Sequence, residues 1–177
     1  DLLRLTRLDS GMLPEAQRVD LSSVMARVVR MLRLVAEEKQ VDLSYEIRRE
    51  GQTLASEDEI HEIIYNLTEN AIKYNRPGGA VRLSVTPEPE KLLIRVSDTG
   101  PGIPERFQRS VFQPFFRVDK SRSREYGGVG LGLSLVWEIT DLHGGCVRVE
   151  ESSDKGTTIA VELPTGTETE PSGADIS

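Results

Sequence analysis

Residues 91–104 read KLLIRVSDTGPGIP, an apolar run rich in β-branched residues that ends in a carboxylate, two glycines and two prolines. An apolar run bounded by turn residues in this way is typical of a buried strand. Asp98 therefore stands at the end of a predicted core strand. Three roles are open to it there: forming a turn, acting as an acid, or binding a ligand.

The segments around this strand predict more strands and the helices that cover them. Strands are expected at 41–47, 80–87, 146–152 and 157–164, and the second of these should form a hairpin with 91–98. Helices are expected at 21–39, 56–74 and 131–143, where apolar residues recur three and four positions apart.

The helical periodicity indicates which faces are buried. The first helix carries its apolar residues at Val24, Val28, Met31, Leu32 and Val35, and the second at Ile60, Ile63, Ile64, Leu67 and Ala71. The predicted fold class is α/β, a two-layer sandwich with a mixed, mostly antiparallel sheet of about five strands. Three helices should cover one face of that sheet.

Composition limits the function classes. The chain has 177 residues, 37% of them hydrophobic, which suits one domain with a core. A formal charge of −7 argues against nucleic acid as a partner. The single cysteine, Cys146, excludes an internal disulfide and fits a reducing compartment. The sequence contains no apolar run of about 20 residues that could span a membrane. The chain begins with Asp1, so we expect it to be part of a longer protein.

The remaining segments give the expected domain organisation. Residues 1–14 suggest the end of a preceding helix and a linker, and 15–164 the domain itself. Within it, residues 100–128 form a stretch without clear periodicity, and connections of that length are commonly lids or binding loops. Residues 165–177 are polar and acidic, which predicts a disordered tail.

The second helix carries the motif NLTENAIKY, residues 66–74. Asn66 and Asn70 are four apart and share one helix face, with Lys73 one turn further along. Asparagine is a poor helix former, so two on one stripe fit either a solvated polar face or a binding site. Two amide oxygens beside a lysine would suit a hydrated Mg²⁺ that bridges phosphates.

The third helix opens with GGVGLGL, residues 127–133. Glycines let a backbone approach a phosphate, and a helix N-terminus offers unpaired N–H groups. The motif lacks the Lys-Ser or Lys-Thr ending of a P-loop and does not directly follow a strand, so a flexible hinge without a ligand remains an alternative interpretation.

The Asp98-Thr-Gly motif suggests a different alternative, because aspartic proteases carry the same three residues at their active site. That chemistry needs two carboxylates in contact, whereas the chain has a single Asp-Thr-Gly.

Taken together, four motifs resemble the boxes of sensor histidine kinases in the family's order. NLTENAIKY resembles the N box, SDTGPGIP the G1 box, VFQPFFRVDKSRS the F box and GGVGLGL the G2 box. The similarity covers residues 20–164 and implies the ATP-binding catalytic domain of the Bergerat fold, with residues 100–128 as the ATP lid. RLTRLDSG, residues 4–11, resembles the end of the dimerisation helix that precedes this domain.

The resemblance also implies roles for individual residues, with ATP and Mg²⁺ as cofactors. Asp98 would accept a hydrogen bond from the exocyclic amine of adenine. The implied nucleotide contacts are Asn70, Lys73, Tyr74, Asp98, Gly100, Gly102, Ile103, Gly128, Gly130, Leu131, Gly132 and Thr157. Phosphoryl transfer would involve Asn66, Lys73 and Arg117, and Mg²⁺ would bind Asn70 with Asn66 as helper. Val129 departs from the Thr or Ser more usual in the G2 box.

One position separates kinases from hydrolases in this superfamily. ATP-hydrolysing relatives have a glutamate four residues before the Mg²⁺ asparagine, and here that position is Asn66. An amide cannot act as a general base, so the resemblance implies transfer to a protein nucleophile with little hydrolysis. Glu62 and Glu69 lie near this position, so an ATP-hydrolysing member of the superfamily remains an alternative. A third hypothesis is a degenerate domain that binds a nucleotide or a partner without catalysis.

The phosphoacceptor is expected outside this chain. His61 lacks the rest of the family's H box, and His143 should cap a helix end before two glycines. The implied partners are therefore the protein's own upstream dimerisation domain and the receiver domain of a response regulator. The fragment is expected to be monomeric and cytoplasmic, and the parent protein homodimeric and bound to the inner membrane.

Overall fold

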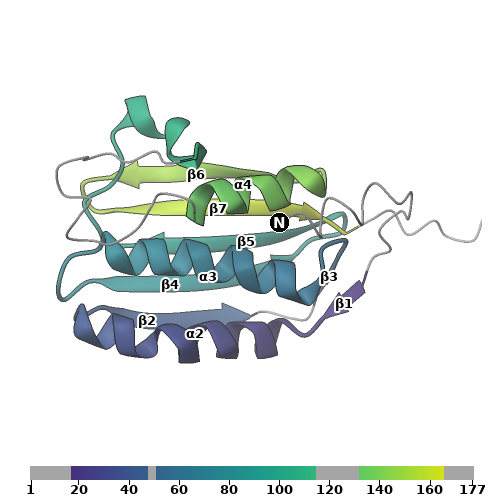
Figure 1. Ribbon diagram of the computed structural model, residues 1–177, viewed down its shortest axis with the longest axis horizontal. Helices are drawn as coiled ribbons and strands as arrows, with labels where there is room; N and C mark the ends of the chain where they lie inside the picture. The colour runs from purple at the N-terminus through teal and green to yellow at the C-terminus, as the bar shows by residue number, and fades with distance from the viewer. Residues whose placement is uncertain (1–16, 48–50, 115–131, 166–177) are drawn as a thin grey trace, which may run out of the picture.

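The computed structural model describes residues 17–47, 51–114 and 132–165 as helices and strands in two layers (Figure 1). The main sheet has five strands in the order β2-β4-β5-β7-β6. Their bounds are Asp42–Ile47 for β2, Ala80–Pro87 for β4, Lys91–Asp98 for β5, Cys146–Ser153 for β6 and Gly156–Pro164 for β7. β2 runs parallel to β4 and every other pair is antiparallel. The predicted mixed, mostly antiparallel sheet is confirmed.

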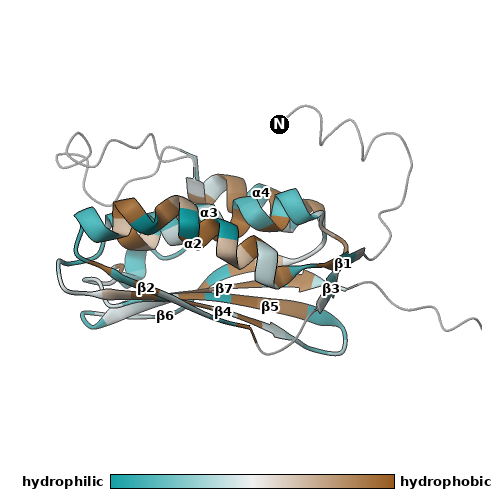
Figure 2. Ribbon diagram, turned by 90° about the horizontal axis from the view of Figure 1, so that it is seen from below, coloured by the Kyte–Doolittle hydropathy of each residue, from teal (hydrophilic) through white to brown (hydrophobic). Residues whose placement is uncertain are grey.

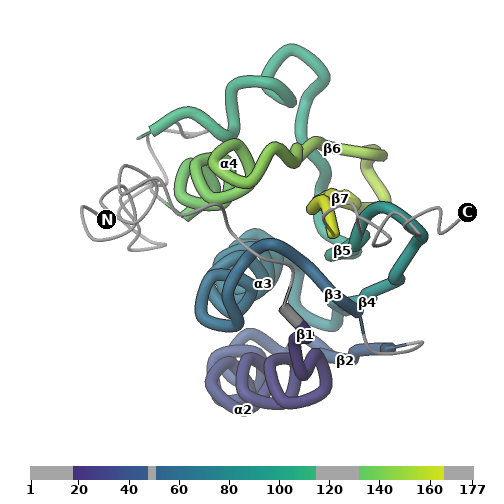
Figure 3. The backbone as a smooth tube through the Cα atoms, turned by 90° about the vertical axis from the view of Figure 1, so that its right-hand side faces the viewer, coloured from purple at the N-terminus to yellow at the C-terminus, as the bar shows by residue number. Residues whose placement is uncertain are grey.

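Three helices lie on one face of this sheet, as predicted (Figures 2 and 3). They are α2 (Leu21–Glu38), α3 (Glu57–Lys73) and α4 (Gly132–Leu142). Alternate residues of the central strands point into the core between the layers, among them Leu92, Ile94 and Val96 of β5. None of the helices in the described parts of the chain combines the length and the apolar character needed to cross a membrane.

The helix α2 differs in part from its predicted buried stripe. Leu21, Val24, Met25, Val28, Val29, Leu32 and Ala36 are buried. Met31 and Val35, which we expected in the stripe, are 57% and 40% exposed. The helix lies over the edge strand β2 (Figure 3), and no other helix of the described chain lies beyond it. The stripe is therefore centred on Leu32, and the prediction for Met31 and Val35 is wrong.

Two short elements were not predicted. β1 (Gln17–Val19) and β3 (Gly51–Thr53) pair antiparallel in a separate two-stranded sheet. It lies at the end of the molecule near the start of α2 (Figure 1). Three-residue strands give too little alternation to be recognised in a sequence.

The structure describes the first half of the predicted lid, residues 100–114. Residues 105–107 and 110–112 form the 3-10 turns η1 and η2 (Glu105–Phe107, Ser110–Phe112). Val111 and Phe112 are buried and belong to the main core. Residues 115–131, the rest of the predicted lid and the start of the G2 box, lie outside the described residues, as do 1–14 and 166–177. Thr165, which we placed in the tail, donates its N–H to the Glu90 carbonyl at 3.0 Å.

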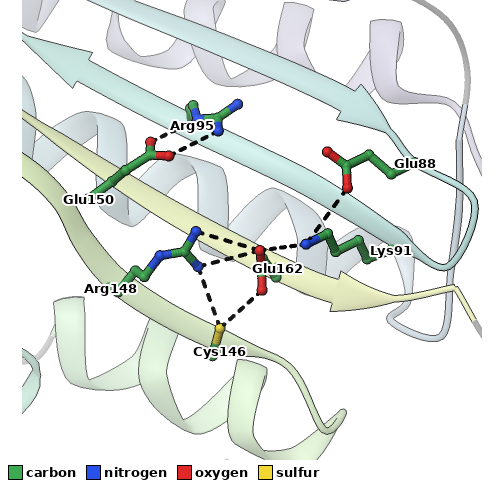
Figure 4. A network of polar contacts seen from close by, with 7 residues as sticks. All are labelled: Glu88, Lys91, Arg95, Cys146, Arg148, Glu150 and Glu162. Atoms are coloured by element: carbon green, nitrogen blue, oxygen red, sulfur yellow. Dashed lines mark hydrogen bonds and ion pairs between the residues drawn. The ribbon is translucent and has the colours of Figure 1, made fainter.

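The open face of the sheet is held by ion pairs across three strands (Figure 4). Arg95 of β5 binds Glu150 of β6 through two nitrogens, at 2.8 and 2.9 Å. Lys91 contacts Glu162 at 2.8 Å, and Arg148 approaches the same carboxylate at 3.5 Å. Exposed pairs stabilise a fold only slightly, so these contacts add little to the backbone pairing that joins β6 to β7.

The helices α3 and α4 are joined by a partly buried polar pair that the sequence did not suggest. Ser56 and Glu59 form a capping box at the start of α3. Glu59 Oε1 accepts from the Ser56 N–H at 3.1 Å, and Oε2 contacts His143 Nε2 at 2.6 Å. His143 follows α4 at its C-terminal end as predicted, but its side chain, 7% exposed, faces Glu59 rather than solvent.

Glu59→Gln is expected to destabilise the domain at neutral pH. Burial alone would raise the pKa of Glu59, but hydrogen bonds to His143 and Ser56 outweigh it and lower the pKa to about 2. Because the folded pKa lies below the ordinary value, this stabilisation is present above pH 4.5 and is lost as the pH falls toward 2. Glutamine keeps the capping box, so the variant should lose about 2 kcal/mol of stability, because it removes the carboxylate that contacts His143.

Urea unfolding between pH 7 and pH 2.5 measures this difference. Glu57→Gln is the matched control, since Glu57 lies exposed in the same first turn and should lose only a few tenths of a kcal/mol. The gap between Glu59→Gln and wild type should shrink on acidification. Equal unfolding midpoints for both variants at pH 7 would contradict the role of the pair.

Candidate functional site

A row of polar side chains ends the apolar core on the helix-covered face of the sheet. Asp98 of β5 pairs with Thr157 of β7, which pairs in turn with Ser152 of β6. The preceding row on the same face is apolar, with Val96 opposite Ile159. Side chains of directly paired residues point to the same face, so the three polar groups lie side by side at the end of the core.

The Asp98 carboxylate is only half satisfied by its neighbours. Its Oδ1 accepts hydrogen bonds from the backbone N–H groups of Gly100 at 2.9 Å and Thr157 at 3.2 Å. Within the described residues, its Oδ2 accepts none. Burial raises the pKa of Asp98, opposed by these two backbone hydrogen bonds. A carboxylate with one oxygen held by two backbone N–H groups and the other oxygen without a donor from the described residues is the observation that best indicates a ligand.

The backbone crowds this carboxylate from two sides. A Cβ on Gly100 would lie 3.1 Å from both Asp98 Oδ1 and the Tyr74 carbonyl oxygen, so the C-terminal end of α3 reaches the site. A Cβ on Gly102 would overlap the Ser153 carbonyl oxygen. Ile103 follows, partly buried against the core, and donates its N–H to Ser152 Oγ at 2.8 Å. The structure thus brings together six predicted site residues: Tyr74, Asp98, Gly100, Gly102, Ile103 and Thr157.

A second set of hydrogen bonds fixes the loop just after Asp98. Thr99 Oγ1 accepts from the Ala80 N–H at 2.8 Å and lies 3.4 Å from Asn75 Oδ1. Asn75, 7% exposed, donates to the Ala80 carbonyl at 3.0 Å. Gly79 packs directly against both side chains. These contacts hold the Asp98 turn against the end of α3.

The remaining predicted residues follow one face of α3 away from Asp98. Asn66 donates through Nδ2 to the Glu62 carbonyl at 2.7 Å, and its Oδ1 faces the first residue of α4, with a Gly132 Cβ position 3.1 Å away. Asn70 is partly buried, and its side chain makes no hydrogen bond with the described residues. Lys73 lies one turn further toward Tyr74. An amide oxygen and an ammonium group at this position fit a hydrated Mg²⁺ and phosphates.

Four predicted site residues lie outside the described residues: Arg117, Gly128, Gly130 and Leu131. Ser152, in contrast, lies at the candidate site in the structure but was not predicted from the sequence. The register of β6 against β7 shifts between Val149 and Glu151, so β6 has an extra residue there. Without this bulge, alternation from Val147 and Val149 would bring residue 151 to the site. A bulge commonly re-aims a side chain in this way, and nothing in the sequence pattern reveals it.

Comparison with known proteins gives consistent results. Residues 55–167 match the family described as histidine kinase-, DNA gyrase B-, and HSP90-like ATPase. The circadian input-output histidine kinase CikA of Synechococcus elongatus is 33% identical over 175 residues, which are 97% of this chain and 23% of that protein. The catalytic domain of histidine kinase ThkA superposes with a TM-score of 0.73 at 26% identity, covering 85% of this chain and 96% of the other.

A further structure, full-length ShkA in complex with AMPPNP, also has a TM-score of 0.73 and 26% identity. The match covers 84% of this chain and 31% of ShkA. The chain spans less than half of the length of curated relatives that it matches, between 11% and 43% for five of them. The similarity therefore concerns one domain of larger proteins.

Proposed function

The chain belongs to the family of histidine kinase-, DNA gyrase B- and HSP90-like ATPases, and on that premise we propose that it is the ATP-binding catalytic domain of a two-component sensor histidine kinase. Residues 15–164 would form that domain. ATP would bind with its base at the polar row and its phosphates along α3. The γ-phosphate would go to a histidine on the protein's own dimerisation domain, and from there to the receiver domain of a response regulator.

The half-satisfied Asp98 carboxylate carries the proposal. Its Oδ1 is occupied by two backbone donors, so Oδ2 remains for a donor from a ligand. The 6-amino group of adenine is such a donor, whereas guanine presents a carbonyl oxygen at the same edge. Gly100 and Gly102 keep Cβ atoms away from the surrounding backbone. The relative ShkA, crystallised with AMPPNP, supports the same ligand class.

The phosphates are assigned to the face of α3 and the start of α4. Asn70 would hold Mg²⁺, with Asn66 and Lys73 close by on the helix. The ion would neutralise charge on the phosphate oxygens. The N-terminus of α4, packed against Asn66 at Gly132, adds the positive end of a helix dipole. Arg117, Gly128, Gly130 and Leu131 complete this assignment by resemblance alone.

The side chain at position 66 favours transfer over hydrolysis. Asn66 is an amide whose nitrogen already donates to the Glu62 carbonyl. An amide cannot take a proton from water, so the domain should lack the general base that a hydrolase needs. The two histidines of the chain are poorly placed as acceptors. His143 Nε2 binds Glu59, and His61 is partly buried and stacks on Tyr65 with ring centroids 6.0 Å apart.

Incubation with ATP labelled at the γ-phosphate tests this proposal, in a sample whose ATP binding has been verified by titration. We expect phosphate release far below the roughly one turnover per second typical of enzymes. We also expect no label on the protein. Steady release at enzymatic rates would instead identify an ATP-hydrolysing member of the family, and label on His61 or His143 would contradict an acceptor located elsewhere.

A further inference from the structure

Ser152 lies beside the proposed adenine site and has no role in the function proposed above. The β-bulge between Val149 and Glu151 turns its side chain to the helix-covered face, opposite Thr157. There Ser152 Oγ lies 2.8 Å from Thr157 Oγ1. It also accepts the backbone N–H of Ile103 at 2.8 Å.

These two hydroxyl groups have few partners in the described structure. Each hydroxyl has one proton to donate. Ser152 Oγ already accepts from Ile103, and among the described residues Thr157 Oγ1 is the one acceptor within reach of the Ser152 proton. When Ser152 donates to Thr157, the Thr157 proton points away from Ser152. In the described structure either direction leaves one hydroxyl proton without an acceptor. A ligand acceptor beside Thr157 would meet the Thr157 proton, so with such a ligand bound the first direction gives both protons a partner, whereas the reverse direction leaves the Ser152 proton without one.

We propose that Ser152 is a positioning residue for base selection: it donates to Thr157 and so makes the Thr157 hydroxyl a hydrogen-bond donor beside the Asp98 acceptor. This inference rests on the proposed function. A donor next to an acceptor complements adenine, whose edge presents the N1 acceptor beside the 6-amino donor. Guanine presents the opposite order, an acceptor at O6 and a donor at N1. Ser152 thereby acts through Thr157, without touching the base itself.

Analogues of ATP separate this role from a merely structural one. In 1-deaza-ATP a C–H group replaces N1, and purine riboside triphosphate lacks the 6-amino group. We expect wild type to bind ATP about 3- to 10-fold more tightly than 1-deaza-ATP, the range of one neutral hydrogen bond. In Ser152→Ala this preference should fall below about 2-fold, while the preference for ATP over purine riboside triphosphate, which depends on Asp98, remains.

The neighbouring serine supplies a matched control. Ser153 is exposed, and within the described residues its Oγ accepts only the Lys155 N–H, at 3.1 Å. Ser153→Ala should keep both preferences. Thr157→Val removes the hydroxyl and keeps the N–H that binds Asp98, so it should lose the N1 preference as Ser152→Ala does. A thermal unfolding curve for each variant shows that the protein measured is folded.

The outcomes separate this inference from the proposed function. If Ser152→Ala weakens binding of ATP and 1-deaza-ATP by the same factor, Ser152 only supports the fold, and the inference is wrong. Equal affinity of wild type for these two nucleotides overturns it without any variant, so it stays testable even if Ser152→Ala does not fold. If wild type binds no adenine nucleotide at all, the proposed function itself fails.

Discussion

Asp98→Asn is expected to weaken ATP binding by at least about 100-fold, because it inverts one hydrogen bond at the base. Asparagine has nearly the same shape, and its Oδ1 can still accept from the Gly100 and Thr157 N–H groups. Its Nδ2, however, replaces the acceptor Oδ2 with a donor. Two donors would then face each other at the 6-amino group of adenine. Calorimetric titration of both proteins with ATP and Mg²⁺ measures the loss.

The same substitution should not destabilise the fold, which makes it a selective test. Burial raises the pKa of Asp98 in the folded protein. A carboxyl whose folded pKa is raised costs stability when it is ionised, and this cost disappears as the pH falls through the folded pKa. At neutral pH, Asp98→Asn removes that cost, so its urea midpoint should equal or exceed that of wild type. Retained ATP affinity in a folded variant would show that Asp98 does not bind the base.

Gly156→Ala is expected to cost about 3 kcal/mol or more of folding stability. Gly156 opens β7 at a φ of +147°, which L side chains rarely adopt. A Cβ there would overlap the carbonyl oxygen of Asp98. To avoid this overlap, β7 would have to move away from the end of β5, which would separate Thr157 from Asp98. ATP binding should therefore fall together with stability.

Gly144→Ala is the matched control for this effect. Gly144 also has a positive φ, +71°, but a Cβ there would meet nothing within 4 Å. Its substitution should cost about 1–2 kcal/mol through backbone conformation alone and leave ATP binding unchanged. Urea unfolding and ATP titration of both variants check the pair. Equal losses of stability in Gly156→Ala and Gly144→Ala would mean that the overlap with the Asp98 carbonyl oxygen does not destabilise the fold.

The sequence predicts the parts of this fold that rest on long, regular patterns. The strands β4 and β5 and the helix α3 each have several apolar residues at one period, so their positions agree with the structure within a residue or two. The buried stripe of α2 was less predictable. Periodicity alone does not reveal that α2 lies at the edge of the helix layer, which leaves Met31 and Val35 exposed.

The motifs predicted which residues lie together at the candidate site, but they did not predict the contacts that support these residues. Asp98 and Thr157 stand at the ends of recognisable strands, and their pairing follows from the sheet. Ser152 depends on a bulge, which reverses the alternation that sequence analysis relies on. The contact of Glu59 with His143 joins residues 84 positions apart, and only the packing of α3 against α4 brings them together.

The central claim, that the polar row binds an adenine base, is tested most directly by titrating the unmodified domain with ATP and with GTP, both with Mg²⁺, in a calorimeter. We predict saturable binding of ATP with a dissociation constant in the micromolar to low-millimolar range, and no detectable binding of GTP. Equal binding of both nucleotides would contradict base recognition by Asp98. A folded domain that binds neither would contradict the assignment of this site to ATP.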